Sequence, residues 1–450
     1  MKNTIKYALT VLTMLLTVDA YAEQDAYDCI TINQDFKHIT KAKKHGLYRQ
    51  AMQSSTPQYD YDRTLAFSEY LNITKALIEA RNPHAQRPCP ITTSVTQVQQ
   101  LVPHAQVVSD IIAPFELRQP NKHKAILLIH GLTDSPFLFH DLAGYFYQQG
   151  FNVRTILLPG HGTAPADLAS VKMTQWQQSA RYAIERTVAD FEQVYLGGFS
   201  TGGALIFDHL MHQTQVSDKI KGLLMWSPAS QAKSEQAWLA KYIAAIPFVT
   251  WLDKDADVDF AKYESFSFNA GAQVNALMNR IEEKQFNTLN RHDIPLLLIA
   301  SEVDQTIETR ASLKLAKFWY QNPNRQSQQQ DQVIYYGQRT AAQAILDPSQ
   351  TVVLPLCDKT TLCSQVKDIA HTSPTNSPSN PHYGVDGVYR NCGHYLAKPD
   401  LYQACKTQPH INMGETTPDN IDAFSPMKRL TFNPYYPQML TSIGQFIQSK

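Results

Sequence analysis

The sequence predicts an α/β protein in which an open, mostly parallel central sheet carries helices on both faces. Short apolar runs that suit buried strands alternate with segments of helical periodicity from about residue 110 onward. One run, 125–130, is uninterrupted, as expected for a central parallel strand that is buried on both sides. In addition, a glycine-flanked serine at 198–202 lies between a predicted strand and a predicted helix.

The composition is that of a globular protein without a dominant charge. The 450 residues include 40 basic and 40 acidic side chains, and 43% of the residues are hydrophobic, which is enough for a substantial core. Because the charges cancel, the sequence predicts neither a nucleic-acid partner nor attraction to an anionic membrane. Nothing in the composition indicates an oligomeric state.

Residues 1–22 have the form of a secretory signal peptide. A short basic lead precedes an apolar run at 7–18, and Ala20-Tyr21-Ala22 has the small residues of a cleavage site. We therefore predict export, to the periplasm or out of the cell, with no integral membrane segment after cleavage. A retained membrane anchor is the alternative, which the short apolar run disfavours.

The six cysteines agree with export, because an even number in an exported chain indicates disulfide bonds. Their clustering favours pairs that are close in sequence, namely Cys29–Cys89, Cys357–Cys363 and Cys392–Cys405. None of them forms a C-x-x-C arrangement, so neither a metal site nor a redox site is predicted.

Residues 23–109 are predicted to be a mostly helical N-terminal extension packed on the main domain. Apolar residues recur at helical spacing in 61–80, and prolines at 83, 88 and 90 end that helix. A separate small domain is the alternative interpretation.

The main domain is predicted to span 110–450, with each strand marked by a short apolar run and each helix by apolar periodicity. The expected strands lie at 110–117, 125–130, 152–157, 193–197, 220–226, 294–300, 332–336 and 351–354. The expected helices lie at 141–150, 174–190, 203–210, 313–320 and 433–449.

The alternation is interrupted at about 227–292, where 238–252 is strongly apolar and has a helical pattern. An insertion here lies above the carboxyl ends of the strands, so we predict a helical cap over the site. Ordinary core aromatics are the alternative. The acidic run Asp253, Asp255, Asp257 and Asp259 lacks the spacing of a metal loop and is predicted to be solvated surface.

Gly198-Phe199-Ser200-Thr201-Gly202 has the pattern of a nucleophile elbow, a sharp turn from strand to helix. The small flanking residues allow the strand and helix to approach, and the turn projects the serine hydroxyl from the sheet edge. Ser200 is therefore the predicted nucleophile. An ordinary glycine-rich turn is the alternative, since the bare motif also occurs by chance.

A serine nucleophile needs a base to accept its proton and an acid to orient that base, and in this architecture the chain order is serine, acid, histidine. Asp304, on the loop after the strand at 294–300, is the predicted acid, with Glu302 and Glu308 as alternatives. The short carboxylate of an aspartate on the loop tip suits a rigid imidazole contact.

The predicted base is His371, which opens a loop rich in serine, proline and asparagine after the last strands. His394 is the second choice because it lies beside a predicted disulfide, where a structural role is more natural. The other late histidines are His382 and His410.

Two backbone N–H groups are expected to form an oxyanion hole. One belongs to Thr201, directly after the nucleophile, and the other to Leu132, where Gly131 lets the chain turn after the strand at 125–130. His130 is predicted to be a structural hydrogen-bonding residue.

His130-Gly131-Leu132, the segment 158–162 (LPGHG) and the serine turn at 198–202, in this order, resemble the α/β-hydrolase superfamily. The closest resemblance is to its carboxylesterase, monoacylglycerol lipase and lysophospholipase-like branch, which also includes serine aminopeptidases. The resemblance covers about 110–450 and implies a cofactor-free serine hydrolase with a cap. The long extension and the long segment between His371 and the last helix depart from the family pattern.

The sequence thus predicts an exported α/β-hydrolase that cleaves carboxylic esters, with an apolar or fatty acyl group in a small, lipid-like substrate. One alternative is an exported serine peptidase or amidase that uses the same three residues. The other is a binding module on the same fold that has no catalytic activity.

Overall fold

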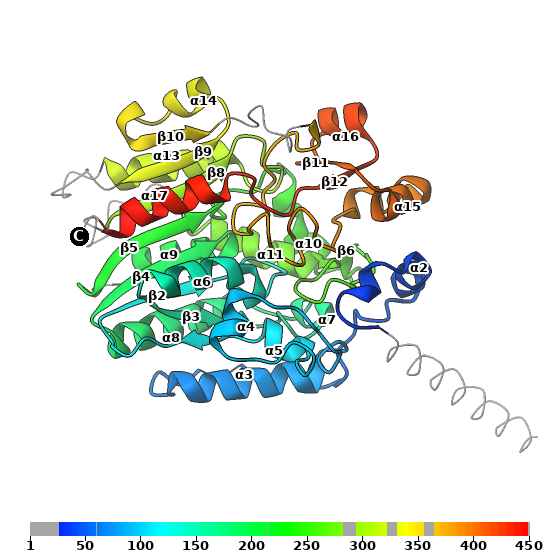
Figure 1. Cartoon of the computed structure of the whole chain (residues 1–450), viewed down its shortest axis with the longest axis horizontal. Helices are drawn as coiled ribbons and strands as arrows, with labels where there is room; N and C mark the ends of the chain where they lie inside the picture. Colours follow the sequence, from blue (N-terminus) through cyan, green and yellow to red (C-terminus); the bar gives the residue numbers. More distant parts are fainter. Residues whose placement is uncertain are drawn as a thin grey trace, which may run out of the picture.

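Eight strands form one sheet in the order β1-β3-β2-β4-β5-β8-β9-β10 (Figure 1). The computed structural model describes residues 27–59, 61–213, 215–281, 294–321, 331–354 and 364–448. In the sheet, β1 runs antiparallel to β3, and the other neighbouring pairs are parallel. The predicted signal peptide and the predicted Cys357–Cys363 bond lie outside the described residues.

The strands of this sheet are β1 (Glu116–Leu117), β2 (Lys124–Ile129), β3 (Asn152–Ile156), β4 (Gln193–Phe199), β5 (Ile220–Trp226), β8 (Leu296–Ser301), β9 (Gln332–Tyr336) and β10 (Thr351–Leu354). Two smaller strand pairs are β6 (Trp251–Asp253) with β7 (Phe266–Ser267), and β11 (Asn412–Gly414) with β12 (Met427–Arg429).

The longer helices are α2 (Phe36–His45), α3 (Phe67–Arg81), α6 (His140–Gln148), α8 (Met173–Asp190), α9 (Thr201–His212), α11 (Phe268–Met278), α13 (Thr309–Tyr320), α15 (Pro399–Thr407) and α17 (Tyr436–Gln448). The shorter helices are α4 (Ser94–Val98), α5 (Val108–Ile112), α7 (Pro165–Leu168), α10 (Ala240–Ile243), α14 (Arg339–Gln343) and α16 (Pro418–Phe424).

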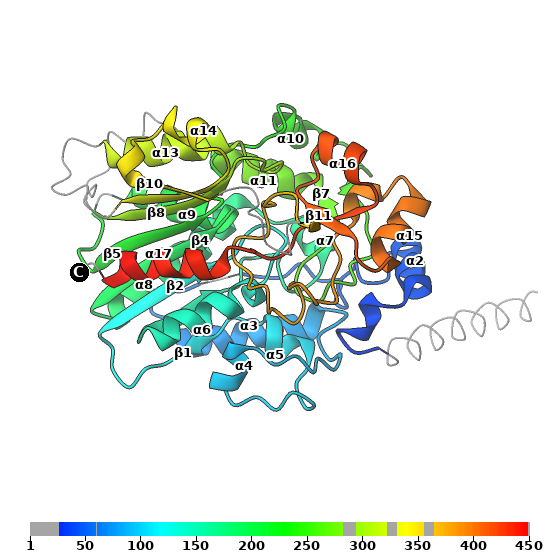
Figure 2. The same cartoon turned by 45° about the horizontal axis from the view of Figure 1, so that its top comes forward.

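Successive side chains of β2 enter two different hydrophobic cores. Leu127 shares one core with Trp176 of α8, whereas Leu128 shares the other with Ile443 of α17. Neighbouring residues of a strand point to opposite faces, so a strand covered by helices on both sides is apolar throughout. This arrangement, which can be followed in Figures 1 and 2, confirms the predicted sheet with helices on both faces.

The predicted strands at 220–226, 332–336 and 351–354 are confirmed residue for residue. The strand predicted at 110–117 is wrong over most of its length, because α5 occupies its first part and only Glu116–Leu117 pairs with β3. The Asp110 carboxylate accepts the N–H of Val107 at 2.9 Å and so caps this helix. The apolar residues of α5 are buried in a separate core that includes Ile78 and Cys89 from the N-terminal residues and Phe137 from the main domain.

The N-terminal residues pack directly on the sheet domain, and the helix predicted at 61–80 begins at Phe67 and ends at Arg81. Arg81 donates two hydrogen bonds to Asp167, at 2.9 and 2.6 Å, and both side chains are buried. Asn82 Nδ2 donates to the carbonyl of Gly162 at 2.7 Å. The predicted Cys29–Cys89 and Cys392–Cys405 disulfides are both present.

The apolar segment at 238–252 is less regular than its helical pattern predicts. It contains a 3₁₀ turn at Ala237–Leu239, the short α10 and the start of β6. The side chains of Trp238, Tyr242 and Phe248 are largely exposed. Among the residues of this insertion that the structure describes, the longest helix is α11, which lies beside α9.

The prediction that the acidic run is solvated is wrong for Asp255, Asp257 and Asp259, which are all buried. Asp257 accepts the N–H groups of two following residues and lies 3.7 Å from the Arg49 guanidinium. Asp259 accepts hydrogen bonds from His382 at 2.8 Å and from the Tyr383 hydroxyl at 2.9 Å. Arg49, His382 and Tyr383 come from distant segments, so the local sequence gives no sign of these contacts.

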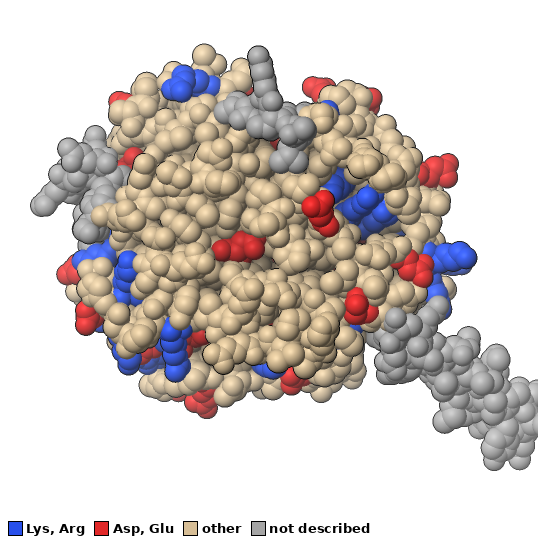
Figure 3. Space-filling view, viewed as in Figure 1, with Lys and Arg blue, Asp and Glu red and all other residues tan. Residues whose placement is uncertain are grey.

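On the face seen in Figure 3, acidic and basic side chains are scattered and separated by wide uncharged areas. Among the residues that the structure describes, no helix is long and apolar enough to cross a bilayer. Within the same ranges, no cluster of three or more His, Cys, Asp or Glu side chains is arranged to hold a metal ion.

Candidate active site

Ser200 lies at the corner between β4 and α9, with φ 49° and ψ −114°. Residues other than glycine rarely adopt this backbone conformation. Its N–H donates to the carbonyl of Trp226 at 2.9 Å, which ties the corner to the end of β5. A Cβ at Gly202 would lie 1.9 Å from the carbonyl oxygen of Ile129, and one at Gly198 would lie 2.5 Å from the nitrogen of Gly203. The glycines therefore permit a tight corner that holds Ser200 in a strained conformation.

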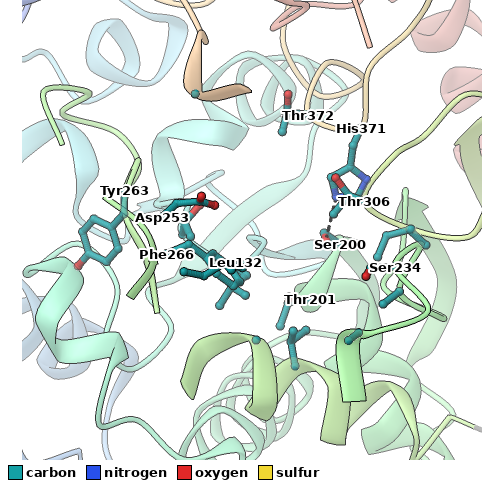
Figure 4. Close-up of a pocket in the computed structure, with 18 of the residues that line it drawn as sticks. Leu132, Ser200, Thr201, Ser234, Asp253, Tyr263, Phe266, Thr306, His371 and Thr372 are labelled. Carbon is teal, nitrogen blue, oxygen red and sulfur yellow. Dashed lines mark hydrogen bonds between the residues drawn. The ribbon is translucent and has the colours of Figure 1, made fainter. Parts of the chain in front are cut away.

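The structure brings Ser200, His371 and Asp304 into one hydrogen-bonded chain. His371 Nδ1 lies 2.6 Å from Asp304 Oδ2. His371 Nε2 lies 3.1 Å from Ser200 Oγ, and this second contact is drawn in Figure 4. A carboxylate only accepts hydrogen bonds, so Nδ1 carries the proton and Nε2 accepts from the serine hydroxyl. All three residues are buried, with exposures of 7% for Ser200, 4% for His371 and 2% for Asp304.

The loop after β8 holds one oxygen of the Asp304 carboxylate. Asp304 Oδ1 accepts the N–H groups of Thr306 and Ile307 at 2.7 and 2.8 Å, which leaves Oδ2 for His371. The Ser301 hydroxyl donates to the carbonyl of Ile369 at 2.6 Å and so joins this loop to the segment that leads to His371.

A cavity of about 600 Å³ opens at Ser200 and His371, and it also reaches Leu132 and Thr201 (Figure 4). Its apolar lining residues include Leu239, Ile243, Phe266, Phe268, Val274 and Met278, all from the insertion after β5. Its polar or charged lining residues include Asp253, Asp255, Lys262, Glu264, Asn391, His394 and Arg429, four of which also belong to the insertion. The arrangement places a hydrogen-bonded serine hydroxyl beside a cavity lined by both apolar and charged side chains.

Comparisons with known proteins find relatives of this chain. A family model described as serine aminopeptidase, S33, matches residues 120–330. A thermostable monoacylglycerol lipase of Bacillus sp. (strain H-257) is 24% identical over 188 residues, which cover 40% of this chain and 71% of that protein. The chain has the α/β-hydrolase fold.

Solved structures with similar folds include those of metagenome-derived lipolytic enzymes, LipS and LipT, and of a monoacylglycerol lipase from Paleococcus ferrophilus. The first is 18% identical with a TM-score of 0.41, over 50% of this chain and 88% of that one. The second is 20% identical with a TM-score of 0.39, over 50% of this chain and 87% of that one.

Leu132 and Thr201, the expected oxyanion-hole donors of this α/β-hydrolase, both line the cavity. Thr201 is the first residue of α9, where backbone N–H groups have no acceptor within the helix. His130 is buried beneath the Leu132 loop, with Nδ1 2.8 Å from the Gly131 carbonyl oxygen and Nε2 accepting the N–H of Leu158 at 3.0 Å. These bonds fit the structural role that the sequence predicts for His130.

The alternative acids and bases have other partners or positions in the hydrolase domain. Glu302 accepts the N–H of Gln338, and Glu308 pairs with Lys233 at 2.8 Å. His382 pairs with Asp259. His394 lines the cavity, and burial lowers its pKa to about 4, whereas His410 is exposed.

Three residues near the site were not anticipated from the sequence. Asp134, two residues after Leu132, lines the cavity, and burial raises the pKa of its carboxyl to about 7. The buried Glu415 and the partly exposed Arg429 form an ion pair beside the loops that carry His371 and Asp304. Asp134 follows the Gly131 turn closely enough to have been suspected, but no local pattern marks the other two.

Proposed function

We propose that this α/β-hydrolase is an exported serine hydrolase that cleaves carboxylic esters through Ser200, His371 and Asp304. The observation that carries the proposal is the hydrogen-bonded chain of these three residues at the wall of a 600 Å³ cavity. The lipase name of the Bacillus relative supports an ester as the substrate.

In the proposed reaction, Ser200 Oγ attacks the ester carbonyl while His371 Nε2 accepts the hydroxyl proton. Asp304 keeps the imidazole in the required tautomer and stabilises its protonated form. The N–H groups of Leu132 and Thr201 stabilise the oxyanion, and the loss of one such donor typically costs about 3 kcal/mol. His371 then protonates the leaving alcohol, and water hydrolyses the acyl-enzyme by the same steps.

We propose an apolar acyl group for the substrate because the insertion contributes aliphatic and aromatic side chains such as Leu239, Phe266 and Met278 to the cavity lining. A series of nitrophenyl esters from acetyl to long acyl chains tests this point. The proposal expects kcat/KM to rise with chain length, and a preference for acetyl esters would contradict it.

Export is supported by the two disulfides, since such bonds persist in oxidising compartments. Cell fractionation combined with N-terminal sequencing of the mature protein tests it. The expected result is a periplasmic or secreted chain that begins after Ala22.

Covalent labelling with a fluorophosphonate tests the reaction itself. Wild-type protein is expected to be labelled at Ser200 and to lose esterase activity in parallel, whereas Ser200→Ala is expected to be neither labelled nor active. A folded wild-type protein that does not react would instead indicate a binding module without catalytic activity.

A peptidase or amidase is the second candidate, because Asp253, Asp255 and Glu264 line the same cavity and could hold a substrate amine. Two of these carboxylates already have partners: Asp255 accepts the Tyr402 hydroxyl at 2.6 Å, and Glu264 lies 3.4 Å from Lys406 Nζ. Parallel assays on nitrophenyl esters and aminoacyl anilides separate the two candidates. If anilides are preferred and Asp253→Asn abolishes only their cleavage, the peptidase proposal replaces the esterase proposal.

A further inference from the structure

The loops that carry Asp304 and His371 meet at one buried carboxylate, that of Glu415. This residue directly follows β11 and is 0% exposed. Its Oε2 accepts the N–H of His371 at 3.0 Å and the N–H of Gln305 at 3.4 Å. Glu415 therefore holds the backbone of the proposed base and of the residue that follows the proposed acid.

Arg429 of β12 pairs with this carboxylate and also contacts the loop that carries Asp304. Its Nε donates to Glu415 Oε1 at 2.7 Å, and its Nη2 donates to Oε2 at 2.8 Å, which gives a two-point contact. The same Nη2 donates to the hydroxyl of Thr306 at 2.9 Å, two residues after Asp304. Burial alone would raise the pKa of the Glu415 carboxyl, but Arg429 and the N–H donors hold that pKa below its usual range.

The pair lies on an ordered framework. Strands β11 and β12 pair in parallel, and the chain that leads to His371 runs beside β11, where Lys367 N–H donates to the carbonyl of Met413 at 2.8 Å. On the other side, Arg429 N–H donates to the carbonyl of Asn391, next to the Cys392–Cys405 disulfide. The positions of Glu415 and Arg429 are thus set by backbone bonds as well as by their own contact.

We infer that Glu415 and Arg429 are positioning residues that keep His371 at hydrogen-bonding distance from both Ser200 and Asp304. The inference rests on the proposed function of those three residues. Glu415 acts through the backbone of the two loops, because its carboxylate contacts their N–H groups. If it is removed, buried N–H groups lose their acceptor and the loops must shift, and a misplacement of about 1 Å can cost about 100-fold in rate.

Glu415→Gln is the main test, because the amide keeps the shape but removes the charge and one acceptor oxygen. We expect kcat to fall by about tenfold to 100-fold while KM changes little, and inactivation by a fluorophosphonate to slow in proportion. Arg429→Lys keeps a cation next to Glu415 and is expected to retain more activity than Arg429→Gln.

Glu116→Gln is the matched control. Glu116 is also a buried glutamate paired with an arginine, since its Oε1 lies 2.7 Å from Arg154 Nε and the two side chains are 4% and 5% exposed. It lies on β1 at the far edge of the sheet. We expect this variant to lower the unfolding temperature as Glu415→Gln does, but to leave kcat unchanged. Equal losses of kcat in both variants would overturn the inference.

Hydrogen–deuterium exchange provides a readout that does not depend on catalysis. In Glu415→Gln, peptides that cover 302–309 and 364–376 are expected to exchange faster, whereas Glu116→Gln leaves them unchanged. If exchange in these loops is unaffected, the inference is wrong whatever the activity. If exchange rises but wild-type Ser200 never reacts with the fluorophosphonate, the proposed function fails and the link between Glu415 and the loops stands.

Discussion

Ser200 and His371 meet in one hydrogen bond, yet they come from regions that are built in different ways. Ser200 stands at the end of β4, between β2 and β5, where regular backbone bonds fix its position. His371 belongs to 364–435, where the described strands are short and side chains, a disulfide and loop contacts maintain the structure. A local sequence pattern can therefore specify the serine, whereas the histidine depends on contacts between distant residues.

The largest loss of activity is expected at Asp304, which contacts His371 and so orients the imidazole that joins the two regions. Asp304→Asn replaces a carboxylate that only accepts by an amide that can donate to Nδ1, so the wrong histidine tautomer is favoured. We expect kcat to fall by about 10⁴-fold with little change in the unfolding temperature. Steady-state kinetics and calorimetry measure the two quantities, and near-normal kcat would contradict the role proposed for Asp304.

Two glycines, one from each region, differ in how closely other atoms pack around them. A Cβ at Gly202 would lie 1.9 Å from a backbone oxygen, whereas at Gly393 the nearest atom is 3.8 Å away. We expect Gly202→Ala to lower the free energy of unfolding by about 3 kcal/mol or more and Gly393→Ala to change it little. Denaturant unfolding measures both free energies. Equal stability of the two variants would contradict the expected difference in packing between Gly202 and Gly393.

The two disulfides provide a similar test of what each region contributes to activity. Replacing both Cys392 and Cys405 by serine is expected to lower stability by about 3 kcal/mol and also to reduce kcat, because that bond braces the framework of Arg429. The same change at Cys29 and Cys89 is expected to affect stability alone. A normal kcat in the first double variant would show that 364–435 does not need its disulfide to position His371.

Asp134 is expected to give the smallest effect, and one that depends on pH. Because the pKa of its carboxyl is raised to about 7, the folded protein binds more protons than the unfolded chain from about pH 4 to pH 7, and stability falls as pH rises through this window. Asp134→Asn removes the penalty, so we expect it to stabilise the protein by about 1–2 kcal/mol at pH 8 and hardly at all at pH 4. Unfolding temperatures across this range provide the check, and a gain that does not vary with pH would contradict it.

The same contrast explains how far the sequence could be interpreted. Strands such as 220–226 could be located because burial on both faces requires a continuous apolar run. The run at 110–117 was wrongly predicted to be a strand, because the apolar residues of α5 are buried in a core that includes residues of the N-terminal extension. No local sequence pattern reveals that contact. Similarly, the burial of Asp257 and Asp259 could not be predicted, because Arg49 and His382, whose side chains contact these carboxylates, are far away in sequence.

For the candidate site, motif order and chain order singled out Ser200, Asp304 and His371, and the structure places them in contact. Glu415 could not be found in this way. It lies 44 positions after His371 and 110 after Gln305, the residues whose N–H groups it accepts. Because Glu415 contacts only backbone N–H groups of these residues, no residue type at a fixed spacing in the sequence marks the contact.

The two bonds between Arg81 and Asp167 have a practical consequence for anyone who trims this protein to its recognisable catalytic portion. A chain that began at residue 110 would lack Arg81 and so leave the Asp167 carboxylate buried without its counter-ion. Breaking a buried ion pair in this way typically lowers the free energy of unfolding by about 3–5 kcal/mol. The shortened chain would also uncover Leu157 and Gly162, whose backbone groups Tyr70 and Asn82 now satisfy. The residues before 110 therefore form part of the buried structure around the sheet and cannot be removed as a separate appendage.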